Sequence, residues 1–302
     1  MPCLLKNKQR NLNRSVNKMQ KQYEVLKWAS FYLEKYNREA RVAEILLQHH
    51  LQVTRSEFFM MMRDPVPDMV VQQYKKDIEK HVKTGIPVQH LTGRECFYGR
   101  DFLVNEHVLI PRPETEELVQ HVIKKLEKSS VEQPIIADIG TGSGIIAITL
   151  ALELPNARVF AADISEAALE TARKNAEQLQ AEVTFLQGDF LEPFIHHQIK
   201  PEMIVSNPPY ISMSEKEKLS DTVQNFDPKL ALFAEENGLA AYKRIIAQSK
   251  QIIKPESAFA FEIGYQQAEA VNELIKNVYP QSDVQVIKDI NGKDRIVFAV
   301  LR

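Results

Sequence analysis

Four consecutive residues, Asn207-Pro208-Pro209-Tyr210, combine groups that suit the binding of a planar NH2 group. They follow the apolar run Met203–Ser206, which is expected to form a buried strand. A side-chain amide oxygen can accept one N–H, and a neighbouring backbone carbonyl can accept a second. Because proline fixes its own φ and keeps the residue before it extended, the two prolines set the backbone of Asn207 and Pro208 in advance. Turns of this kind also occur without function, so the surrounding residues have to decide.

A glycine-rich loop stands between another short apolar strand and a helix. It reads Asp138-Ile139-Gly140-Thr141-Gly142-Ser143-Gly144 and is compatible with a dinucleotide or another adenosine cofactor. Its spacing is G-x-G-x-G, whereas the dinucleotide fingerprint is G-x-G-x-x-G, and Ile145 stands in place of the third glycine. Asp138 would repel a pyrophosphate and attract an ammonium group. We therefore assign to a cofactor site Asp138, Gly140, Thr141, Gly142, Ser143 and Gly144.

Two further acids end the next two predicted strands. Asp163 is placed to accept hydrogen bonds from both hydroxyls of a ribose. Asp189 could bind an adenine amino group, and Phe190 could pack on the adenine ring. Open α/β sheets bind ligands at these strand ends, and together the residues indicate S-adenosylmethionine, with its methyl group beside the 207–210 turn. The predicted cofactor site is completed by Asp163, Ile164, Asp189, Phe190 and Asn207.

The elements that must position these residues alternate between strands and helices. Strands are predicted at residues 135–137, 158–162, 183–186, 203–206 and 258–263, and helices at 115–126, 144–153, 166–178 and 238–253. Residues 284–288 and 295–300 are predicted to pair antiparallel around a turn at Asn291-Gly292. This order predicts an α/β fold, a doubly wound sheet with an antiparallel edge.

The N-terminal part of the chain has a different pattern. Apolar residues recur at helical spacing from residue 23 to about residue 83, which predicts a small α-helical bundle over residues 21–85. The Phe-Phe-Met-Met-Met run at 58–62 is expected to lie in its core. Residues 86–112 are predicted to form a β-hairpin or linker. Residues 1–20 are basic and lack the apolar segment of a signal peptide, so a disordered extension is expected there.

The composition narrows the function classes. The 302 residues include 38 Lys and Arg against 40 Asp and Glu, a net charge of −2 that disfavours a nucleic-acid substrate. With 44% hydrophobic and 26% charged residues and no long apolar run, the chain is expected to be soluble, cytoplasmic and without a membrane span. The spacing of its cysteines and histidines fits no metal site, so no metal is expected.

The chain closely resembles the HemK/PrmC family, protein-(glutamine N5) methyltransferases that act on peptide chain release factors. The matching segments include residues 110–116, which read IPRPETE, the glycine loop, 205–211, 262–264 and 289–295. The Asn-Pro-Pro-Tyr turn is shared with DNA adenine and RNA guanine methyltransferases, whereas the IPRPETE segment is more particular to this family. One departure is the Gly-Gly-x-Asp-Gly stretch that family members usually carry after the turn. It reads Phe233-Ala234-Glu235-Glu236-Asn237-Gly238 here.

This resemblance implies a class I (Rossmann-like) S-adenosylmethionine methyltransferase sheet in residues 113–302 and a helical domain that binds the release factor. The substrate would be the glutamine of the Gly-Gly-Gln motif in release factors 1 and 2, acted on by a monomer. The Asn207 side chain and the Pro208 carbonyl would accept the two amide hydrogens, and Tyr210 would wall the glutamine slot. Arg112 and Glu114 would either form an ion pair that fixes the hairpin or contact the release factor or the cofactor. The predicted catalytic and substrate-binding residues are Asn207, Pro208, Pro209, Tyr210, Arg112 and Glu114.

Three alternatives remain. A methyltransferase for exocyclic amino groups of nucleic acids (adenine N6 or guanine N2) would need a target-recognition domain or a basic cleft. An NAD-dependent oxidoreductase is disfavoured by Asp138 and by the glycine spacing. A non-catalytic translation-factor-binding protein would have no reason to retain every cofactor position.

Overall fold

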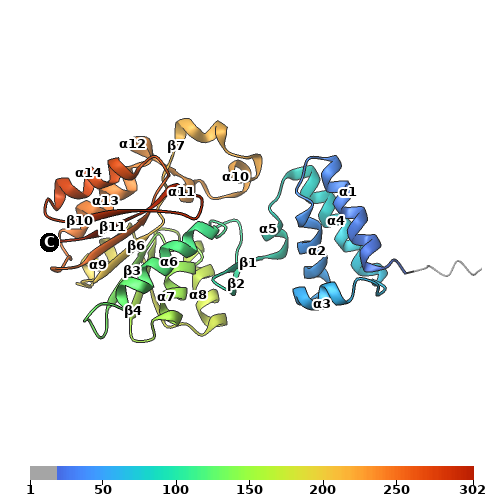
Figure 1. Cartoon of the computed structure of the whole chain (residues 1–302), viewed down its shortest axis with the longest axis horizontal. Coiled ribbons are helices and arrows are strands. Elements are labelled where there is room, and N and C mark those ends of the chain that lie inside the picture. The colour runs from blue at the N-terminus through green and yellow to red at the C-terminus, as the bar shows by residue number, and fades with distance from the viewer. Residues whose placement is uncertain (1–18) are drawn as a thin grey trace, which may run out of the picture. The chain divides into compact units, whose positions relative to one another are not determined.

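The computed structural model describes residues 19–302, which divide after Thr92 into two compact units (Figure 1). The predicted limits of the linker, residues 86 and 112, lie on either side of this division, and the hairpin belongs to the second unit. Residues 1–18, most of the predicted disordered extension, lie outside the described residues. Among residues 19–302, every helix is too short or too polar to span a lipid bilayer.

The first unit is built from helices α1 to α5. Their bounds are Gln22–Lys35, Arg41–Leu51, Arg55–Met60, Asp68–Thr84 and Val88–Thr92. The helical pattern is confirmed on α1, where Val25, Ala29 and Leu33 are fully buried in the core of the unit. A capping box between Thr54 and Glu57 begins α3, since the Thr54 hydroxyl accepts from the Glu57 N–H.

The prediction that the whole 58–62 run lies in this core was wrong. Phe58 is fully buried, but Phe59 and Met60 keep 49% and 76% of their surface exposed. Consecutive residues of a helix point in directions about 100° apart, so α3 can bury only one face against its neighbours.

The second unit contains a seven-stranded sheet in the order β10-β11-β9-β6-β3-β4-β5. Five strands are parallel to one another, namely β3 (Ile135–Ile139), β4 (Arg158–Asp163), β5 (Val183–Gln187), β6 (Met203–Ser206) and β9 (Ala258–Glu262). The C-terminal hairpin of β10 (Asp283–Lys288) and β11 (Asp294–Val300) is antiparallel, and β11 pairs with β9. The predicted α/β fold with an antiparallel edge is thereby confirmed.

Helices cover both faces of this sheet (Figure 1). One face packs against α6 (Pro113–Leu126), α7 (Ile145–Glu153) and α8 (Glu166–Leu179), and the other against α9 (Glu192–His196), α13 (Ala240–Ser249) and α14 (Ala268–Val278). The first face buries Leu118 and Ile148, and the second buries Tyr242 and Ile275. The near-continuous apolar sequence of the parallel strands follows from burial on both faces.

The hairpin of β1 (Arg94–Phe97) and β2 (Arg100–Leu103) is fastened to the sheet through α8. The buried Asn175 side chain accepts from the Leu103 N–H at 2.7 Å and donates to the Leu103 carbonyl at 3.0 Å. It also donates to the Ser143 carbonyl in the glycine loop at 2.9 Å. One amide therefore connects the hairpin with the predicted cofactor loop.

Short elements follow the 207–210 turn. They are β7 (Ile211–Ser212), the 3-10 helix η1 (Met213–Lys218), α10 (Asp221–Phe226), α11 (Lys229–Leu232), β8 (Phe233–Ala234) and α12 (Glu235–Gly238). Strands β7 and β8 pair in parallel, so the chain returns to the turn that it left.

Candidate active site

The C-terminal ends of neighbouring parallel strands bring the predicted site residues to one edge of the sheet. Asp138 of β3 is in register with Val205 of β6, and Ser206 is in register with Phe261 of β9. The Ser206 hydroxyl donates to the carbonyl of Ile139 at 2.6 Å. This bond joins the start of the glycine loop to the start of the 207–210 turn.

Two carboxylates shape the glycine loop. The Asp138 carboxylate accepts from the Thr141 hydroxyl at 2.6 Å and from the Ala147 N–H at 3.2 Å. The Asp163 carboxylate accepts from the Gly142 N–H at 2.9 Å. A Cβ atom added to Gly142, or to Gly140 before it, would have no atom within 4 Å, so the loop borders open space. The loop can therefore present its backbone closely to a ligand.

Asp138 is fully buried, and its carboxylate is only partly hydrogen-bonded. Burial raises the pKa of its carboxyl to about 7, although the bonds from Thr141 and Ala147 act in the opposite direction. Its second oxygen, Oδ1, is buried without a hydrogen-bond partner among the described residues. Buried polar atoms are nearly always paired, so this oxygen is suited to a donor that a ligand supplies.

Asp163 and Ile164 lie at the end of β4. The Asp163 carboxylate also accepts from the Ser165 N–H at 2.9 Å, and burial raises its pKa above the ordinary range. Ile164 beside it exposes 56% of its surface. A fixed carboxylate and an exposed aliphatic side chain are thus neighbours at this strand end.

Asp189 and Phe190 both contact Arg244, which was not among the predicted site residues. The Arg244 guanidinium of α13 pairs with the Asp189 carboxylate and lies over the Phe190 ring, 5.2 Å from its centroid. Both interactions are favourable for a guanidinium. No local pattern around residue 244 indicates this, because the contact depends on how α13 packs on the sheet.

The 207–210 turn is held from two sides. The Asn207 side-chain NH2 donates to the Thr115 hydroxyl of α6 at 3.2 Å, and the Gln267 side-chain NH2 donates to the Tyr210 carbonyl at 3.0 Å. Pro208 is buried, whereas Asn207 and Tyr210 are partly exposed. Burial raises the pKa of Tyr210 to about 12, so its hydroxyl stays neutral near pH 7.

Gly238, the last residue of the stretch that departs from the family pattern, packs closely against the same turn. Its φ is +84°, and a Cβ at this position would lie 2.1 Å from the Tyr210 carbonyl oxygen. Glu236 and Asn237, in the stretch that departs from the family pattern, also adopt left-handed φ values of 52° and 57°. Neither residue has the conformational freedom of glycine, so each left-handed φ costs about 1 kcal/mol.

The IPRPETE segment begins α6 and contacts several parts of the unit. Arg112 donates to Asp227 at 2.9 Å, and the Asp227 side chain is only 2% exposed. This ion pair fixes the segment after the 207–210 turn and not the β1–β2 hairpin. The hairpin is held by Glu116, whose carboxylate accepts from the Tyr98 N–H at 2.7 Å. Glu114 contributes through its charge, which raises the pKa of the buried carboxyl of Glu262 beyond the effect of burial.

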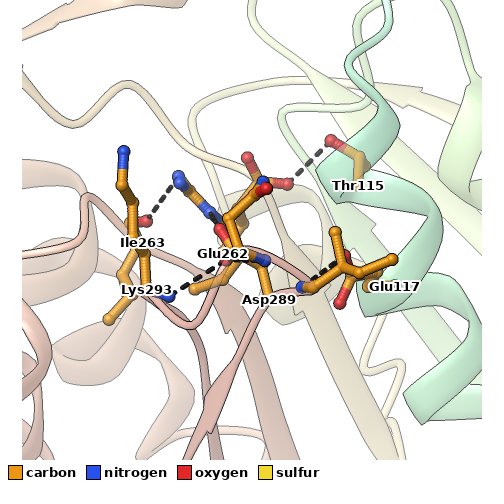
Figure 2. A network of polar contacts seen from close by, with 9 residues as sticks. Thr115, Glu117, Glu262, Ile263, Asp289 and Lys293 are labelled. Atoms are coloured by element: carbon orange, nitrogen blue, oxygen red, sulfur yellow. Dashed lines mark hydrogen bonds and ion pairs between the residues drawn. The ribbon is translucent and has the colours of Figure 1, made fainter.

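Figure 2 shows a polar network that links α6 to the end of β9 and to the β10–β11 turn. The Thr115 hydroxyl donates to the Glu262 carboxylate at 2.7 Å, and Glu117 accepts from the Ile290 N–H at 3.2 Å. Arg295 donates to the Ile263 carbonyl and to the Asp289 carboxylate, both at 3.2 Å. Thr115 and Glu262 lie in segments that match the family, but no role was predicted for them, because only the spatial arrangement connects them to Asn207.

Two family models match the chain. The one described as PrmC N-terminal domain matches residues 24–93, and the one described as Methyltransferase small domain matches residues 115–229. The first covers the helical unit, and the second includes the glycine loop and the 207–210 turn.

Curated relatives match nearly the full length. A release factor glutamine methyltransferase from Bacillus cereus is 45% identical over 278 residues, which cover 92% of this chain and 98% of the relative. A protein of the same name from Bacillus subtilis strain 168 is 45% identical over 281 residues, covering 92% of this chain and 97% of its own length.

A solved structure shares the fold at lower sequence identity. The catalytic domain of hMettl16, in complex with MAT2A 3'UTR hairpin 1, has a TM-score of 0.53 and 16% identity. The match covers 97% of this chain and 94% of that one. It supports the class I methyltransferase fold.

Proposed function

This chain belongs to the release factor glutamine methyltransferase family, and we propose that it methylates the side-chain nitrogen (N5) of the glutamine in the Gly-Gly-Gln motif of release factors 1 and 2. The observation that carries this proposal is the bond between Ser206 and Ile139, which holds the amide-binding turn against the cofactor loop. A methyl acceptor in the turn and a methyl donor in the loop would then meet at one edge of the sheet.

The residues of this edge fit S-adenosylmethionine. The unpartnered Oδ1 atom of Asp138 would accept from the ammonium group, and Asp163 would accept from the ribose hydroxyls. Asp189 and Phe190 would contact the adenine. Arg244, which already contacts both residues, would lie beside it. When bound, this cofactor supplies a methyl group on a positively charged sulfur.

The turn supplies the acceptor half of the reaction. An amide nitrogen is a weak nucleophile because its lone pair is shared with the carbonyl. The Asn207 side-chain oxygen and the Pro208 carbonyl would accept its two hydrogens, fix its orientation and raise its electron density. Catalysis would then come mainly from positioning and from fixed dipoles, and the proton would leave to water. Tyr210, neutral near pH 7, would form one wall of the glutamine slot.

The proposed partner is a release factor in the cytoplasm. The relatives carry that substrate in their names, and the helical unit matches the PrmC N-terminal domain. We assign release factor binding to this unit. We assign to Arg112 and Glu114 the role of supporting the part of the site that binds the substrate. We further propose that the protein acts as a monomer and binds no nucleic acid directly.

The Asn207→Ala variant tests the proposed function. We expect it to lose methyl transfer to a release factor while it binds S-adenosylmethionine with nearly wild-type affinity, because only the acceptor grip is removed. Transfer is measured with a radiolabelled methyl group on purified release factor and on nucleic acid, and binding is measured by calorimetry.

The control is Asn156→Ala, an exposed asparagine before β4 at the opposite end of the sheet, which should methylate normally. Wild-type transfer by Asn207→Ala would refute the mechanism. Labelling of nucleic acid in place of release factor by the wild-type protein would refute the substrate.

A further inference from the structure

A directed chain of hydrogen bonds joins Asn207 to Glu262 through Thr115, with Asn207 as the first donor. The Glu262 carboxylate accepts from the Thr115 hydroxyl at 2.7 Å, and the same hydroxyl oxygen accepts from the Asn207 NH2 at 3.2 Å (Figure 2 shows the first bond). A threonine hydroxyl has one hydrogen. Once Thr115 donates it to Glu262, its oxygen can only accept from Asn207.

Both supporting residues are almost fully buried, at 1% exposure each. They belong to distant segments, with Thr115 in the first turn of α6 and Glu262 at the end of β9. Water therefore does not compete for their bonds, and the sheet and the helix fix their separation. The chain is set before a substrate binds.

Its direction matters because the two ends of an asparagine amide have nearly the same shape. Packing alone does not determine whether the oxygen or the NH2 group faces a substrate. The proposed reaction requires the oxygen of Asn207 to accept from the glutamine NH2. The reverse orientation would set two NH2 groups against each other.

We propose that Thr115 and Glu262 are positioning residues that keep the Asn207 side-chain oxygen turned toward the acceptor glutamine. This inference rests on the proposed function, since it concerns the same amide grip. Thr115 does not touch the reacting atoms and acts only through Asn207.

The protonation state of Glu262 sets the direction of the chain. An ionised carboxylate can only accept, whereas a protonated one can donate to Thr115, which is then free to donate to the Asn207 oxygen. Burial raises the pKa of Glu262 to about 7, and Arg295 and Arg112 act against this effect while Glu114 adds to it. The other titratable groups that face Glu262 are Tyr210 and Tyr242, and the Tyr242 hydroxyl donates to the Glu262 carbonyl at 2.7 Å.

The first test compares Thr115→Val, Thr115→Ser and Thr171→Val. Thr171 is a matched control because its hydroxyl accepts from the Asn105 NH2 at 2.9 Å and is also buried, but in α8. We expect Thr115→Val to lower kcat about tenfold, with S-adenosylmethionine affinity unchanged, whereas Thr115→Ser and Thr171→Val stay near wild type. A Thr115→Val variant with wild-type kcat contradicts the inference, as does an equal loss of kcat in Thr171→Val.

The second test measures the pH profile of kcat in Glu262→Gln, which also serves if Thr115→Val does not fold. Wild-type kcat should fall as the pH is lowered through about 7, the pKa of Glu262, and this acid limb should be absent in Glu262→Gln. The profile is measured at saturating S-adenosylmethionine, so that protonation of Asp138 in the cofactor site, whose pKa is also about 7, does not limit the rate. Under this condition, an acid limb that persists in the variant, or a wild type without one, contradicts the role of Glu262. Failure of the wild-type protein to methylate release factor would instead contradict the proposed function.

Discussion

The carboxylate of Asp163 accepts one backbone N–H on each oxygen, from Gly142 and from Ser165. Each oxygen has a further lone pair, so the residue that fixes the loop can still accept hydrogen bonds from a ligand. Asp138 shows the complementary case, with one oxygen fully engaged and the other without a partner among the described residues. At the scale of single residues, both carboxylates of the site are therefore held in place by hydrogen bonds and can still accept further hydrogen bonds from a ligand.

Asp163→Ala should weaken S-adenosylmethionine binding. The change removes the proposed ribose acceptor and releases the Gly142 N–H, and hydrogen bonds to a charged group contribute about 1.5–3 kcal/mol each. We expect at least a tenfold rise in the dissociation constant, measured by calorimetry. The exposed Asp101→Ala is the control, and an unchanged affinity in Asp163→Ala would refute the ribose assignment.

Asp138→Asn should alter the pH dependence of stability. The folded-state pKa of about 7 lies above the ordinary aspartate value of 3.8, so between these values the unfolded chain has lost a proton that the folded protein keeps. The free energy of unfolding therefore falls as pH rises toward 7.

The stability of Asp138→Asn does not fall in this way, because asparagine does not titrate. The free energy of unfolding of the variant relative to wild type should therefore increase by about 3 kcal/mol between pH 5 and pH 8. Urea unfolding followed by circular dichroism at the two pH values measures the difference. The same difference at both pH values would show that burial of Asp138 is not linked to its proton. Asp101→Asn, with an exposed carboxylate, controls for the change of charge.

Residue types at strand ends could be predicted because strand periodicity and the order of elements indicate which residues follow each strand. The acids Asp138 and Asp163 and the amide Asn207 were predicted in this way, and the structure brings them to one edge of the sheet. The contacts of Thr115 and Arg244 could not be predicted, because each depends on the packing of a helix against a distant strand end.

At the scale of elements, the beginning of α6 organises the site. Four residues of one helical turn and its approach, Arg112, Thr115, Glu116 and Glu117, bond to segments that are far apart in the sequence. Their partners are Asp227, Glu262, Tyr98 and the Ile290 N–H. The start of α6 thus holds the hairpin, the segment after the 207–210 turn and the C-terminal strands in place relative to one another.

Gly238→Ala should disrupt the 207–210 turn. An added Cβ would lie 2.1 Å from the Tyr210 carbonyl oxygen and 2.7 Å from the Gln267 side-chain nitrogen, so the turn would have to move. We expect kcat for release factor methylation to fall at least tenfold, since a shift of this size misplaces the amide grip.

Gly292→Ala is a matched control for this variant. Its φ of +76° resembles the +84° of Gly238, but its added Cβ would meet no atom within 4 Å. Both variants carry the left-handed strain of about 1 kcal/mol, and only Gly238→Ala carries the clash. Equal effects on kcat would show that backbone strain, and not contact with Tyr210, accounts for the loss.

Among the elements, the parallel strands and most of the longer helices of the second unit could be predicted, whereas α14 and the short elements after the 207–210 turn could not. The parallel strands and helices α6 to α8 have strong periodicity, and their bounds lie within a few residues of those expected. Helices α9 and α14 and the short elements between residues 211 and 238 were not predicted. Those short elements depend on tertiary contacts such as the β7–β8 pair, which a local pattern does not contain.

At the scale of the whole molecule, the chain forms two units with separate hydrophobic cores. Changes in periodicity along the chain predicted the helical bundle and the α/β class of the second unit, but they did not predict the order of the strands in the sheet. The position of β11 between β9 and β10 was not predicted, because alternation identifies a strand but not its neighbours.

The separate cores predict separate unfolding transitions. The chain has one tryptophan, Trp28, which packs against the core of the first unit, so its fluorescence reports on that unit. Phe261→Ala, in the second unit, should cost about 3–5 kcal/mol and shift the circular dichroism transition without moving the Trp28 transition.

Leu33→Ala, fully buried in the first unit, is the reciprocal variant and should move the Trp28 transition. Urea unfolding followed by both probes distinguishes the outcomes. A Phe261→Ala variant that moves both transitions together would show that the two units unfold as one cooperative body.

The hydrogen-bond chain from Glu262 to Asn207 also bears on how the enzyme rejects a near copy of its substrate. Glutamate has almost the same size and shape as glutamine, but its carboxylate carries only acceptors. A site whose Asn207 oxygen is held outward by Thr115 would oppose that carboxylate with another acceptor. A buried polar site that loses its matching donor discriminates far more strongly than a difference in shape does. We therefore expect a release factor with glutamate at the modified position to be a poor competitive inhibitor.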